Sequence, residues 1–211
     1  MVQKCVSKQA LQRMPLYLGY LKSLGDSMPA TISATVIAQA LGLGDVQVRK
    51  DLAVLNIAGK PKVGYITKEL ISALERYLGY DELNNSIIVG AGKLGRALLS
   101  YEGFTEYGLH ILAGFDINPK YAGTYEGEKP ILPMEKLPSL CRRLNVRIGI
   151  ITVPADSAQG VCDLLVKSGV RAIWNFAPVH LTVPDNILVQ SVNMASSLAL
   201  LSNHLSDKIY K

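Results

Sequence analysis

Apolar positions along the chain follow two different periods, and the change falls near residue 80. Before residue 80 they recur every three or four residues, which predicts helices. After it, apolar runs of about five to eight residues alternate with helical segments, which predicts strands connected by helices. Alternation of this kind is typical of a doubly wound parallel sheet. We therefore expect an α/β chain whose first part is a separate, mainly helical domain.

The first helix is expected to begin after Ser7, whose hydroxyl can cap it, and to end before Gly25. Pro15 lies inside this segment, so we expect a break or a second N-terminal turn there, because proline lacks the N–H group that a helix interior needs. The expected apolar stripe of the helix consists of Leu11, Met14, Leu18 and Leu21.

Two short helices joined by a glycine-containing turn are expected next. Ser33 caps the first helix, and Asp45 caps the second, which runs to about residue 56. The expected inward faces are Val36, Ile37, Ala40 and Leu41 on the first helix, and Val48, Leu52 and Leu55 on the second. Gln47, Arg49 and Lys50 project away from this core. The arrangement is typical of a helix-turn-helix, whose second helix reads the major groove of DNA.

Residues 59–65 place Lys60 and Lys62 between two glycines, which predicts a short basic hairpin beside a DNA backbone. A solvated linker loop beside a merely structural helical hairpin is the alternative. Residues 1–80 hold ten Lys and Arg against five Asp and Glu, whereas residues 81–211 hold twelve of each. The formal excess of +5 therefore lies in the first part, which favours a polyanionic partner. A helix over residues 67–80 and a boundary at residues 79–82 complete this part.

The second part opens with an apolar strand that leads into glycines at positions 90, 92 and 95. Gly90 permits a tight strand-to-helix turn, Gly92 lets a pyrophosphate approach the backbone, and Gly95 brings the helix close to the sheet. The phosphates would lie on free N–H groups at the helix N-terminus. The candidate phosphate-binding residues are Gly90, Ala91, Gly92, Lys93, Leu94 and Gly95. The alternative is a bare structural turn.

A second strand over residues 109–115 ends at Asp116, twenty-one residues after Gly95. A carboxylate at this place accepts hydrogen bonds from an adenosine ribose in Rossmann-type domains. Asp116 is followed by Ile117-Asn118-Pro119, without an Arg to hold a 2′-phosphate, which favours NAD(H) over NADP(H). Lys120 is nearby, and a solvated turn residue is the alternative interpretation of Asp116.

The rest of the second part alternates between the two kinds of structure. Residues 123–133 are rich in Gly and Pro and are expected to form a loop. Expected after it are a helix at 135–144, a strand at 146–153, a helix at 155–168 and strands at 172–176 and 187–189. Ligands bind at the carboxyl ends of such strands. Candidate cofactor contacts in the two loops that leave these ends are Thr152, Val153, Pro154, Asn175, Phe176, Ala177 and Pro178. The alternative is that these residues only form ordinary connecting loops.

The last segment, residues 193–205, is expected to be a helix with an apolar stripe formed by Met194, Leu198, Leu201 and Leu205. The stripe packs either on its own domain or against a second subunit. We divide the chain into a DNA-binding domain at residues 1–80, a nucleotide-binding domain at 81–191 and a terminal segment at 192–211.

Composition excludes several other classes of protein. No run of about eighteen apolar residues appears, so no membrane span is expected, and the N-terminus lacks the apolar core of a signal peptide. Both observations predict a cytoplasmic protein. Cys5, Cys141 and Cys162 are scattered without a CxxC pair, which predicts free thiols and neither a metal site nor disulfides. The three histidines are isolated, so we assign them no ligand or catalytic role.

Over almost its full length the chain resembles the Rex family of redox-sensing transcriptional repressors. The matching stretches are RMPLYLGYL, ISATVIAQALGLGDVQVRKDL, GKPKVGY, VGAGKLGRALLSYEGF, ITVPADSAQ and NFAPVHLTVP. The resemblance implies a winged helix before a Rossmann-type domain, and a final helix that is exchanged between two subunits. It also implies a homodimer that binds a palindromic operator with NAD+ or without ligand and is released by NADH.

The resemblance adds residues to the candidate sites. Arg13 and Tyr101 match positions that the family uses around the nicotinamide and the interdomain contact. Pro61 stands where the family usually has a basic wing residue, and Asn193 stands where an acidic residue commonly begins the exchanged helix. Tyr101 joins the cofactor candidates. The candidate DNA contacts are Arg13, Ser33, Gln47, Arg49, Lys50, Lys60, Lys62 and Tyr65.

Two other functions compete with a repressor. An NAD-dependent dehydrogenase would need a proton donor or acceptor near the nicotinamide. The Tyr-x-x-x-Lys match from Tyr125 to Lys129 contains Gly127 and is followed by Pro130, which argues against the helix that would align both side chains. We therefore expect no enzymatic activity. A nucleotide-binding scaffold that does not bind DNA is the third alternative.

Overall fold

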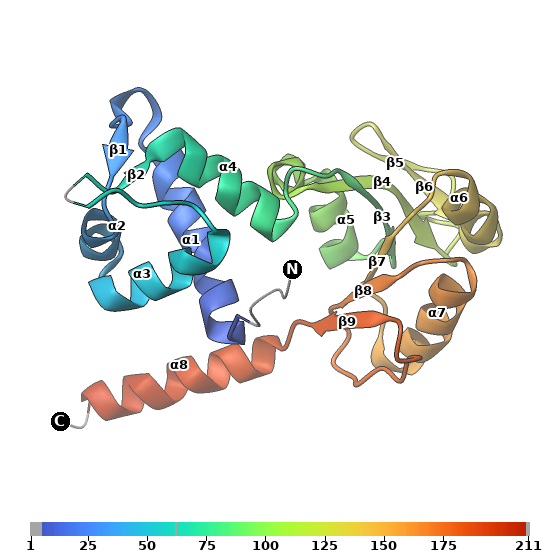
Figure 1. The fold of residues 1–211 in the computed structure, drawn as a ribbon. Helices are drawn as coiled ribbons and strands as arrows, with labels where there is room; N and C mark the ends of the chain where they lie inside the picture. The colour runs from blue at the N-terminus through green and yellow to red at the C-terminus, as the bar shows by residue number, and fades with distance from the viewer. Residues whose placement is uncertain (1–5, 62, 210–211) are drawn as a thin grey trace. The chain divides into compact units, whose positions relative to one another are not determined.

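The computed structural model describes residues 6–61 and 63–209. Two candidates, Lys62 and Cys5, lie outside these described residues. The chain divides into two compact units, Met1–Glu82 and Leu83–Lys211, which are described one at a time (Figure 1). Whether the end of the chain is a separate dimerisation segment stays a prediction.

The first unit is a small helical domain with a two-stranded sheet. Its elements are α1 (Lys8–Ser23), β1 (Thr31–Ile32), α2 (Ala34–Leu41), α3 (Asp45–Leu52), β2 (Tyr65–Ile66) and α4 (Thr67–Leu78), with 3₁₀ turns at Gly25–Ser27 and Ala53–Leu55. Strands β1 and β2 pair antiparallel. The connection between α3 and β2 forms the wing of a winged helix-turn-helix.

Helix α1 differs from the prediction in two ways. The Ser7 hydroxyl does cap it, by accepting the N–H of Ala10 at 3.1 Å. The expected break at Pro15 is wrong, because the helix continues through it to Ser23. Leu11 is exposed rather than part of the stripe, and the buried face consists of Ala10, Met14, Tyr17, Leu18 and Leu21. Packing of this face outweighs the one backbone hydrogen bond that the proline removes.

Helices α2 and α3 form the expected pair around a shared core. Ser33 caps α2 by accepting the N–H of Val36 at 3.2 Å, whereas the residue before α3 is Gly44, so Asp45 lies in the first turn. Val36 and Ala40 are exposed, which corrects the predicted inward face of α2. Its buried residues are Ala34, Ile37 and Ala38, and those of α3 are Val48, Asp51 and Leu52.

The second unit contains a seven-stranded sheet in the order β5-β6-β4-β3-β7-β8-β9. All neighbours pair parallel except β5 and β6. Its strands are β3 (Asn84–Val89), β4 (Leu109–Asp116), β5 (Tyr125–Glu126), β6 (Lys129–Pro133), β7 (Ile148–Ile151), β8 (Ala172–Asn175) and β9 (Leu188–Ser191). Its helices are α5 (Lys93–Ser100), α6 (Leu137–Arg143), α7 (Ala155–Lys167) and α8 (Met194–Ile209), with 3₁₀ turns at Glu102–Tyr107 and Met134–Lys136. The expected doubly wound sheet is confirmed.

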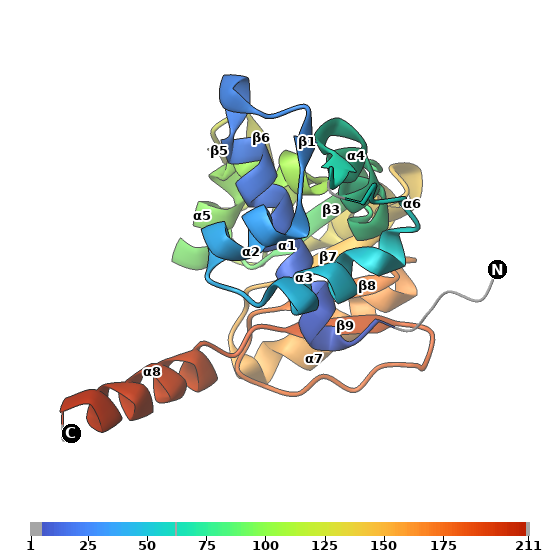
Figure 2. The ribbon, with the colours of Figure 1, turned by 60° about the vertical axis from the view of Figure 1, so that its left-hand side comes forward.

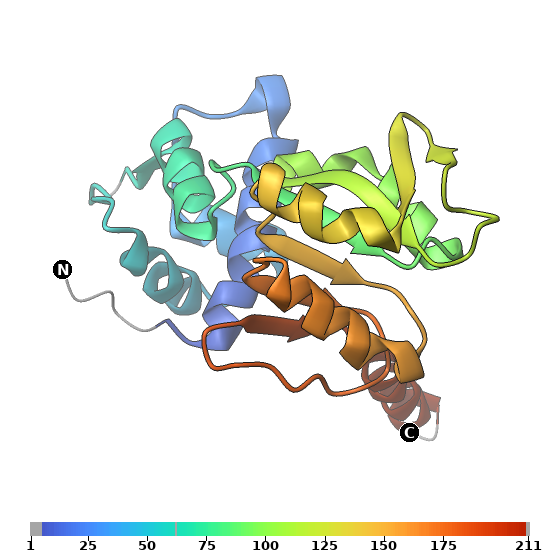
Figure 3. The same ribbon diagram turned by 90° about the vertical axis from the view of Figure 1, so that its right-hand side faces the viewer.

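Helices cover both faces of this sheet. The gold helix α6 and the orange helix α7 lie on one face (Figure 3), where their side chains pack on Val89, Phe115 and Ile151. Helix α5 packs on the opposite face against Ile88, Ile111 and Ile150. Cys141 and Cys162 are free and buried in the first of these cores. Burial raises the pKa of the Cys141 thiol to about 11, so this thiol stays protonated at neutral pH.

Residues 123–133 form a β-hairpin at the edge of the sheet, so the predicted loop is wrong. Gly123 and Gly127 have positive φ and make the turns, while Ile131 of β6 is buried against β4. Prolines are tolerated in β6 because each is paired on one side only, Pro130 with Tyr125 of β5 and Pro133 with Asp116 of β4. Lys129 donates from Nζ to the carbonyl of Leu99 at 2.8 Å, which ties the hairpin to the end of α5. As expected, Tyr125 and Lys129 do not share a helix.

Helix α8 projects beyond β9 at the end of the second unit (Figure 2). The predicted stripe is present but exposed, with Met194, Leu198, Leu201 and Leu205 each between 50% and 63% exposed. Packing of the stripe on its own domain is therefore wrong. In the part of the chain that the structure describes, no helix combines the length and apolarity needed to cross a membrane.

Gly64, in the wing, and Gly79, at the end of α4, both have a positive φ but differ in the space around them. A Cβ at Gly64, where φ is +91°, would lie 2.3 Å from the carbonyl oxygen of Ile32, whereas a Cβ at Gly79, where φ is +71°, meets nothing within 4 Å. We predict that Gly79→Ala lowers the free energy of unfolding by about 1–2 kcal/mol, from backbone strain alone. Gly64→Ala should lower it by about 2–5 kcal/mol, because strain and overlap add. Denaturant titration followed by circular dichroism measures both, and equal losses would contradict the assignment.

Candidate functional site

The turn between β3 and α5 is built on two glycines that the backbone itself requires. Gly90 has φ +102°, and a Cβ there would lie 2.9 Å from the carbonyl of Thr152. A Cβ at Gly95 would lie 1.8 Å from the carbonyl oxygen of Gly90. Gly92 is different, because a Cβ there meets nothing within 4 Å. The structure therefore leaves open space beside Gly92, where a ligand can approach the backbone.

Thr152, which follows β7, holds this turn in place. Its hydroxyl lies 2.7 Å from the carbonyl oxygen of Gly90, and its N–H donates to Val89 at 2.9 Å. Helix α5 then begins at Lys93 without a side-chain cap. The N–H groups of its first turn and the positive end of its dipole can bind a phosphate.

Asp116 closes the other side of the turn from the end of β4. Its carboxylate accepts the N–H of Ala91 at 2.6 Å through one oxygen and the N–H of Asn118 at 2.8 Å through the other. These bonds fix the carboxylate beside the glycine turn. Each oxygen keeps a lone pair, so Asp116 can still accept hydrogen bonds from the hydroxyls of a ribose.

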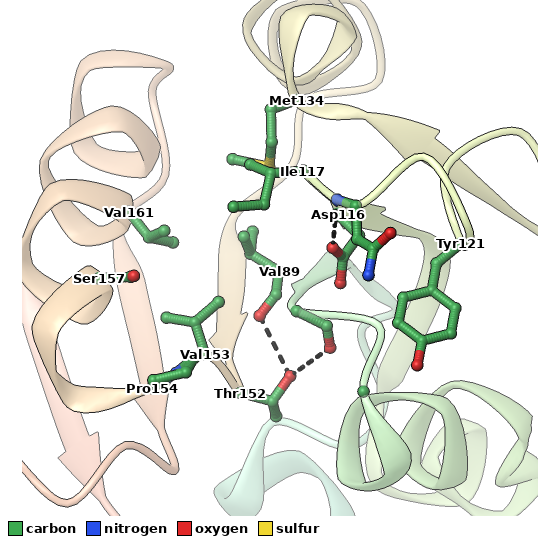
Figure 4. A pocket seen from close by; sticks show the side chains of 13 residues that line it. Val89, Asp116, Ile117, Tyr121, Met134, Thr152, Val153, Pro154, Ser157 and Val161 are labelled. Atoms are coloured by element: carbon green, nitrogen blue, oxygen red, sulfur yellow. Dashed lines mark hydrogen bonds between the residues drawn. The ribbon is translucent and has the colours of Figure 1, made fainter.

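These groups surround one hollow of about 560 Å³ at the carboxyl ends of β3, β4 and β7. Figure 4 shows Asp116 and Tyr121 on one side and Pro154, Ser157 and Val161 on the other. Of the predicted cofactor residues, the hollow brings together Gly90, Gly92, Asp116, Thr152, Val153 and Pro154. Its volume and mainly apolar lining suit a nucleotide-sized ligand.

Other lining residues were missed by the sequence reasoning: Val89, Ile117, Asn118, Tyr121, Met134, Ser157 and Val161. Met134 follows β6, the strand that was predicted to be loop. Recognition of that strand would have placed Met134 at the same sheet edge as Asp116, because carboxyl ends of parallel strands share an edge.

The loop after β8 borders a second hollow of about 710 Å³ instead. Phe176, Ala177 and Pro178 line it together with Asn193 and Met194 at the start of α8. The Asn175 side chain is buried; it donates to the carbonyl of Val179 at 2.9 Å and accepts the N–H of Ala177 at 2.9 Å. Asn175 thus shapes the loop, and its side chain does not face the 560 Å³ hollow.

Tyr101 begins a row of aromatic rings on the α5 face of the sheet. Its half-exposed ring packs edge-on against Phe104, with 4.9 Å between centroids. Phe104 contacts Trp174 of β8, which contacts Phe176 in turn. The row connects the end of α5 to the loop that borders the second hollow.

Helix α3 presents the predicted polar groups to solvent. Gln47, Arg49 and Lys50 are exposed, and Arg49 forms an ion pair with Asp45 one turn earlier. Val46, which the sequence reasoning missed, is 57% exposed among them. An exposed aliphatic side chain on such a surface can contact a thymine methyl group.

The wing is a tight turn, with the N–H of Lys60 donating to Gly64 at 2.8 Å and that of Gly64 returning to Lys60 at 2.9 Å. Lys60 is exposed, whereas the half-buried Tyr65 ring lies against Gly59. The structure gives Tyr65 a packing role, and the hydroxyl of Ser33 already caps α2. Of the wing candidates that the structure describes, Lys60 is therefore the one best placed to reach a partner.

Arg13 is half-buried in the first unit, where it pairs with Asp51, and its contact with DNA stays a prediction. Its Nε and Nη2 donate to the two carboxylate oxygens of Asp51 at 2.7 and 2.9 Å. The Tyr17 hydroxyl donates to the same carboxylate at 2.6 Å. In the second unit, the side chain of Asn193 accepts the N–H of Ser196 at 2.9 Å and so caps α8.

Family models match both units. A model described as "CoA binding domain" matches residues 81–179, and one described as "Putative DNA-binding protein N-terminus" matches residues 5–53. The matches fall on the dinucleotide-type hollow and on the helix-turn-helix respectively.

Relatives named "Redox-sensing transcriptional repressor Rex" match nearly the whole chain. The one from Treponema denticola is 40% identical over 206 residues, covering 98% of both chains. The one from Carboxydothermus hydrogenoformans is 42% identical over 197 residues, covering 93% of this chain and 95% of its own.

Solved structures of a Rex-family repressor called RSP agree with this. The structure of RSP with β-NAD+ and operator DNA superposes with a TM-score of 0.91 at 34% identity, covering 98% of this chain and 95% of its own. The structure with β-NADH superposes with a TM-score of 0.86 at 34% identity, covering 98% and 97%. Relatives and structures together show that this chain belongs to the Rex family of redox-sensing transcriptional repressors, which are not enzymes.

Proposed function

We propose that the chain is a repressor that binds a palindromic operator as a homodimer and leaves it when NADH binds. One observation carries the proposal. A single chain joins an exposed recognition helix to a preformed dinucleotide hollow, and RSP, with the same fold, is described in complex with β-NAD+ and operator DNA. A repressor acts where the DNA is, so we place the protein in the cytoplasm.

The cofactor fits the second unit in one direction. The pyrophosphate lies on the turn from Gly90 to Gly95, with the adenosine ribose on Asp116. The nicotinamide then lies beyond Thr152, toward the loop of Phe176 and Pro178. In a doubly wound sheet this second half of the dinucleotide belongs to the strands past the switch point between β3 and β7.

Asp116 also selects between cofactors. Its carboxylate is fixed by two backbone N–H groups, so it cannot turn away from a 2′-phosphate. Repulsion between the two anions therefore disfavours NADP(H). We propose NAD+ and NADH as the ligands.

DNA binding falls to the outward face of α3 and to the wing. Gln47, Arg49 and Lys50 offer groups that reach base edges or phosphates, and Lys60 offers a phosphate contact. A dimer is needed because a palindrome presents two half-sites at fixed spacing.

Helix α8 is the proposed source of that dimer. Its exposed stripe of Met194, Leu198, Leu201 and Leu205 would leave much apolar surface in water in a single chain. Burial of one such side chain stabilises by about 1.5–3 kcal/mol, so eight of them across a twofold interface can hold two chains together.

Release by NADH requires that NADH bind the DNA-incompetent arrangement of the dimer more tightly than the competent one. Tyr101 and Asn193 are the proposed participants. Asn193 lines the second hollow, and Tyr101 is connected to that hollow by the row of aromatic rings that ends at Phe176. Arg13 already pairs with Asp51, so we do not include it among these participants.

The main experiment selects operator sequences from random DNA and measures affinity by fluorescence anisotropy, with NAD+, NADH or no ligand. We predict tight binding to a palindrome that NADH weakens by about 5–150-fold, the usual range of allosteric coupling.

Lys50→Ala should weaken operator binding by about 1–3 kcal/mol. Lys167→Ala, an exposed lysine in the last turn of α7, is the matched control and should change nothing. Equal affinity for random DNA, or indifference to NADH, would refute the proposal.

Two glycine variants distinguish a glycine needed for cofactor binding, Gly92, from a glycine needed for the fold, Gly95. Gly92→Ala should leave the unfolding midpoint unchanged, because its Cβ meets open space, but should weaken NADH binding by roughly tenfold or more, since the methyl occupies the pyrophosphate's approach. Gly95→Ala should lower the midpoint, because its Cβ overlaps the carbonyl oxygen of Gly90. Titration calorimetry and thermal denaturation test both variants. Full NADH affinity in Gly92→Ala would remove this turn from the site.

The dimer is tested by charge within the α8 stripe. We predict that Leu198→Glu with Leu201→Glu gives a monomer in sedimentation velocity and lowers operator affinity, because a buried carboxylate without a partner is costly. Asn203→Glu places one glutamate on the opposite side of the helix and should leave a dimer. A dimer in both variants would show that the subunits associate elsewhere.

A further inference from the structure

A buried carboxylate lies on the inner face of the proposed recognition helix. Asp51, in the last turn of α3, is 5% exposed and receives three hydrogen bonds from α1. Two come from the guanidinium of Arg13, at 2.7 and 2.9 Å, and one from the hydroxyl of Tyr17, at 2.6 Å. We call these three residues the α1–α3 anchor.

The anchor fixes α3 in a way that apolar packing does not. Val48 and Leu52 bury the same face of α3, but apolar contacts tolerate small rotations and slides. Arg13 and Tyr17 are four residues apart on α1, so both reach one carboxylate from the same side. A bidentate Arg–carboxylate pair also fixes direction, because its two parallel bonds form only in one relative orientation.

Rotation of α3 matters at its outer surface. With side chains the radius of a helix is about 5–6 Å, so a rotation of about 20° moves the outer groups by about 2 Å. Hydrogen bonds to base edges hold over a range of only about 0.5 Å. Lys50 directly precedes Asp51, and Gln47 lies one turn before it, so the orientation of Asp51 determines where both side chains lie.

We propose that Arg13, Tyr17 and Asp51 are positioning residues that set the rotation of α3 and thereby the base specificity of the repressor. The proposal rests on the proposed function, in which α3 enters the major groove. None of the three residues needs to touch DNA. Phosphate contacts from exposed lysines depend less on this rotation, because a flexible ammonium group reaches a phosphate from many directions.

The charges of the anchor suit a permanent contact. Burial and the neighbouring Asp51 raise the pKa of Tyr17 to about 12, so its hydroxyl remains a donor at neutral pH. Burial alone would raise the pKa of Asp51, but the hydrogen bonds from Arg13 and Tyr17 outweigh it and hold the pKa below its usual value. Asp51 therefore stays ionised opposite the guanidinium.

The test compares specific with non-specific binding in the full-length protein. Affinities for the selected operator and for an unrelated duplex of equal length are measured by anisotropy at several salt concentrations. Asp51→Asn and Arg13→Lys should weaken operator binding by about tenfold or more, the size of a lost base contact. Affinity for the unrelated duplex, the salt dependence and NADH affinity should stay within about twofold, since phosphate contacts and the nucleotide hollow are intact.

Two further variants separate positioning from stability. Tyr17→Phe keeps the buried ring and removes one donor, so it decides the question if Asp51→Asn does not fold. Glu75→Gln is the matched control, because Glu75 pairs with Lys22 at 2.8 Å and ties α1 to α4 without touching α3. It should leave both DNA affinities within about twofold.

Three outcomes overturn the proposal. If operator and unrelated duplex lose affinity together in the anchor variants, the anchor only stabilises the domain. If Tyr17→Phe and a folded Asp51→Asn keep the wild-type preference for operator, the rotation of α3 is set elsewhere. A wild-type protein without any preference for a selected operator would instead contradict the proposed function, and with it the role of the anchor.

Discussion

The close approach of helix α5 to the sheet determines the geometry of the second unit. Gly95 lies so near the carbonyl of Gly90 that a single added carbon would overlap it at 1.8 Å. Thr152 binds the same carbonyl from β7, so three segments meet at one backbone oxygen. At the other end of α5, Lys129 of the edge hairpin donates from Nζ to the carbonyl of Leu99 at 2.8 Å. The phosphate-binding turn is therefore preformed, held from both ends of its helix.

In the first unit, the orientation of the helices depends on more than the apolar core. Four helices share one apolar cluster, and helices packed by aliphatic side chains alone can settle in more than one orientation. A buried ion pair is a poor source of stability, because the desolvation of two charges offsets much of their attraction. Its directional bonds nevertheless specify one arrangement, and Asp51 lies on the side of α3 opposite the surface proposed to contact DNA.

Sequence periodicity and glycine spacing predicted the architecture and the centre of the nucleotide site, because both are local demands of the backbone. The positive φ of Gly90 and the contact at Gly95 follow from one strand-to-helix turn. The errors arise where tertiary contacts outweigh local preference. Burial of Met14, Tyr17 and Leu18 keeps α1 helical through Pro15. Pairing with β4 makes a strand of the Gly- and Pro-rich segment at 123–133.

Side-chain partners were harder to predict than elements. Arg13 joined the candidate DNA contacts through the resemblance to the Rex family, which says nothing of its partner within the first unit. Its actual partner, Asp51, lies 38 residues away, and the short sequence RKD around it hides which of the three charges turns inward. The spacing of Val48 and Leu52 predicts that Asp51 is the charged residue that turns inward, since it falls on the same side of the helix as these buried residues.

In the second unit, the proposed nicotinamide side lies beside the start of helix α8. The loop after β8 and the first residues of α8 border the same hollow, so a ligand that contacts Phe176 or Pro178 lies next to the N-terminus of α8. The helix exposes its apolar stripe, which no described residue of its own unit buries. Coupling requires contacts that differ between two states. In the proposed dimer, helix α8 supplies such contacts against a second subunit, so the proposal makes the dimer the unit that responds to NADH.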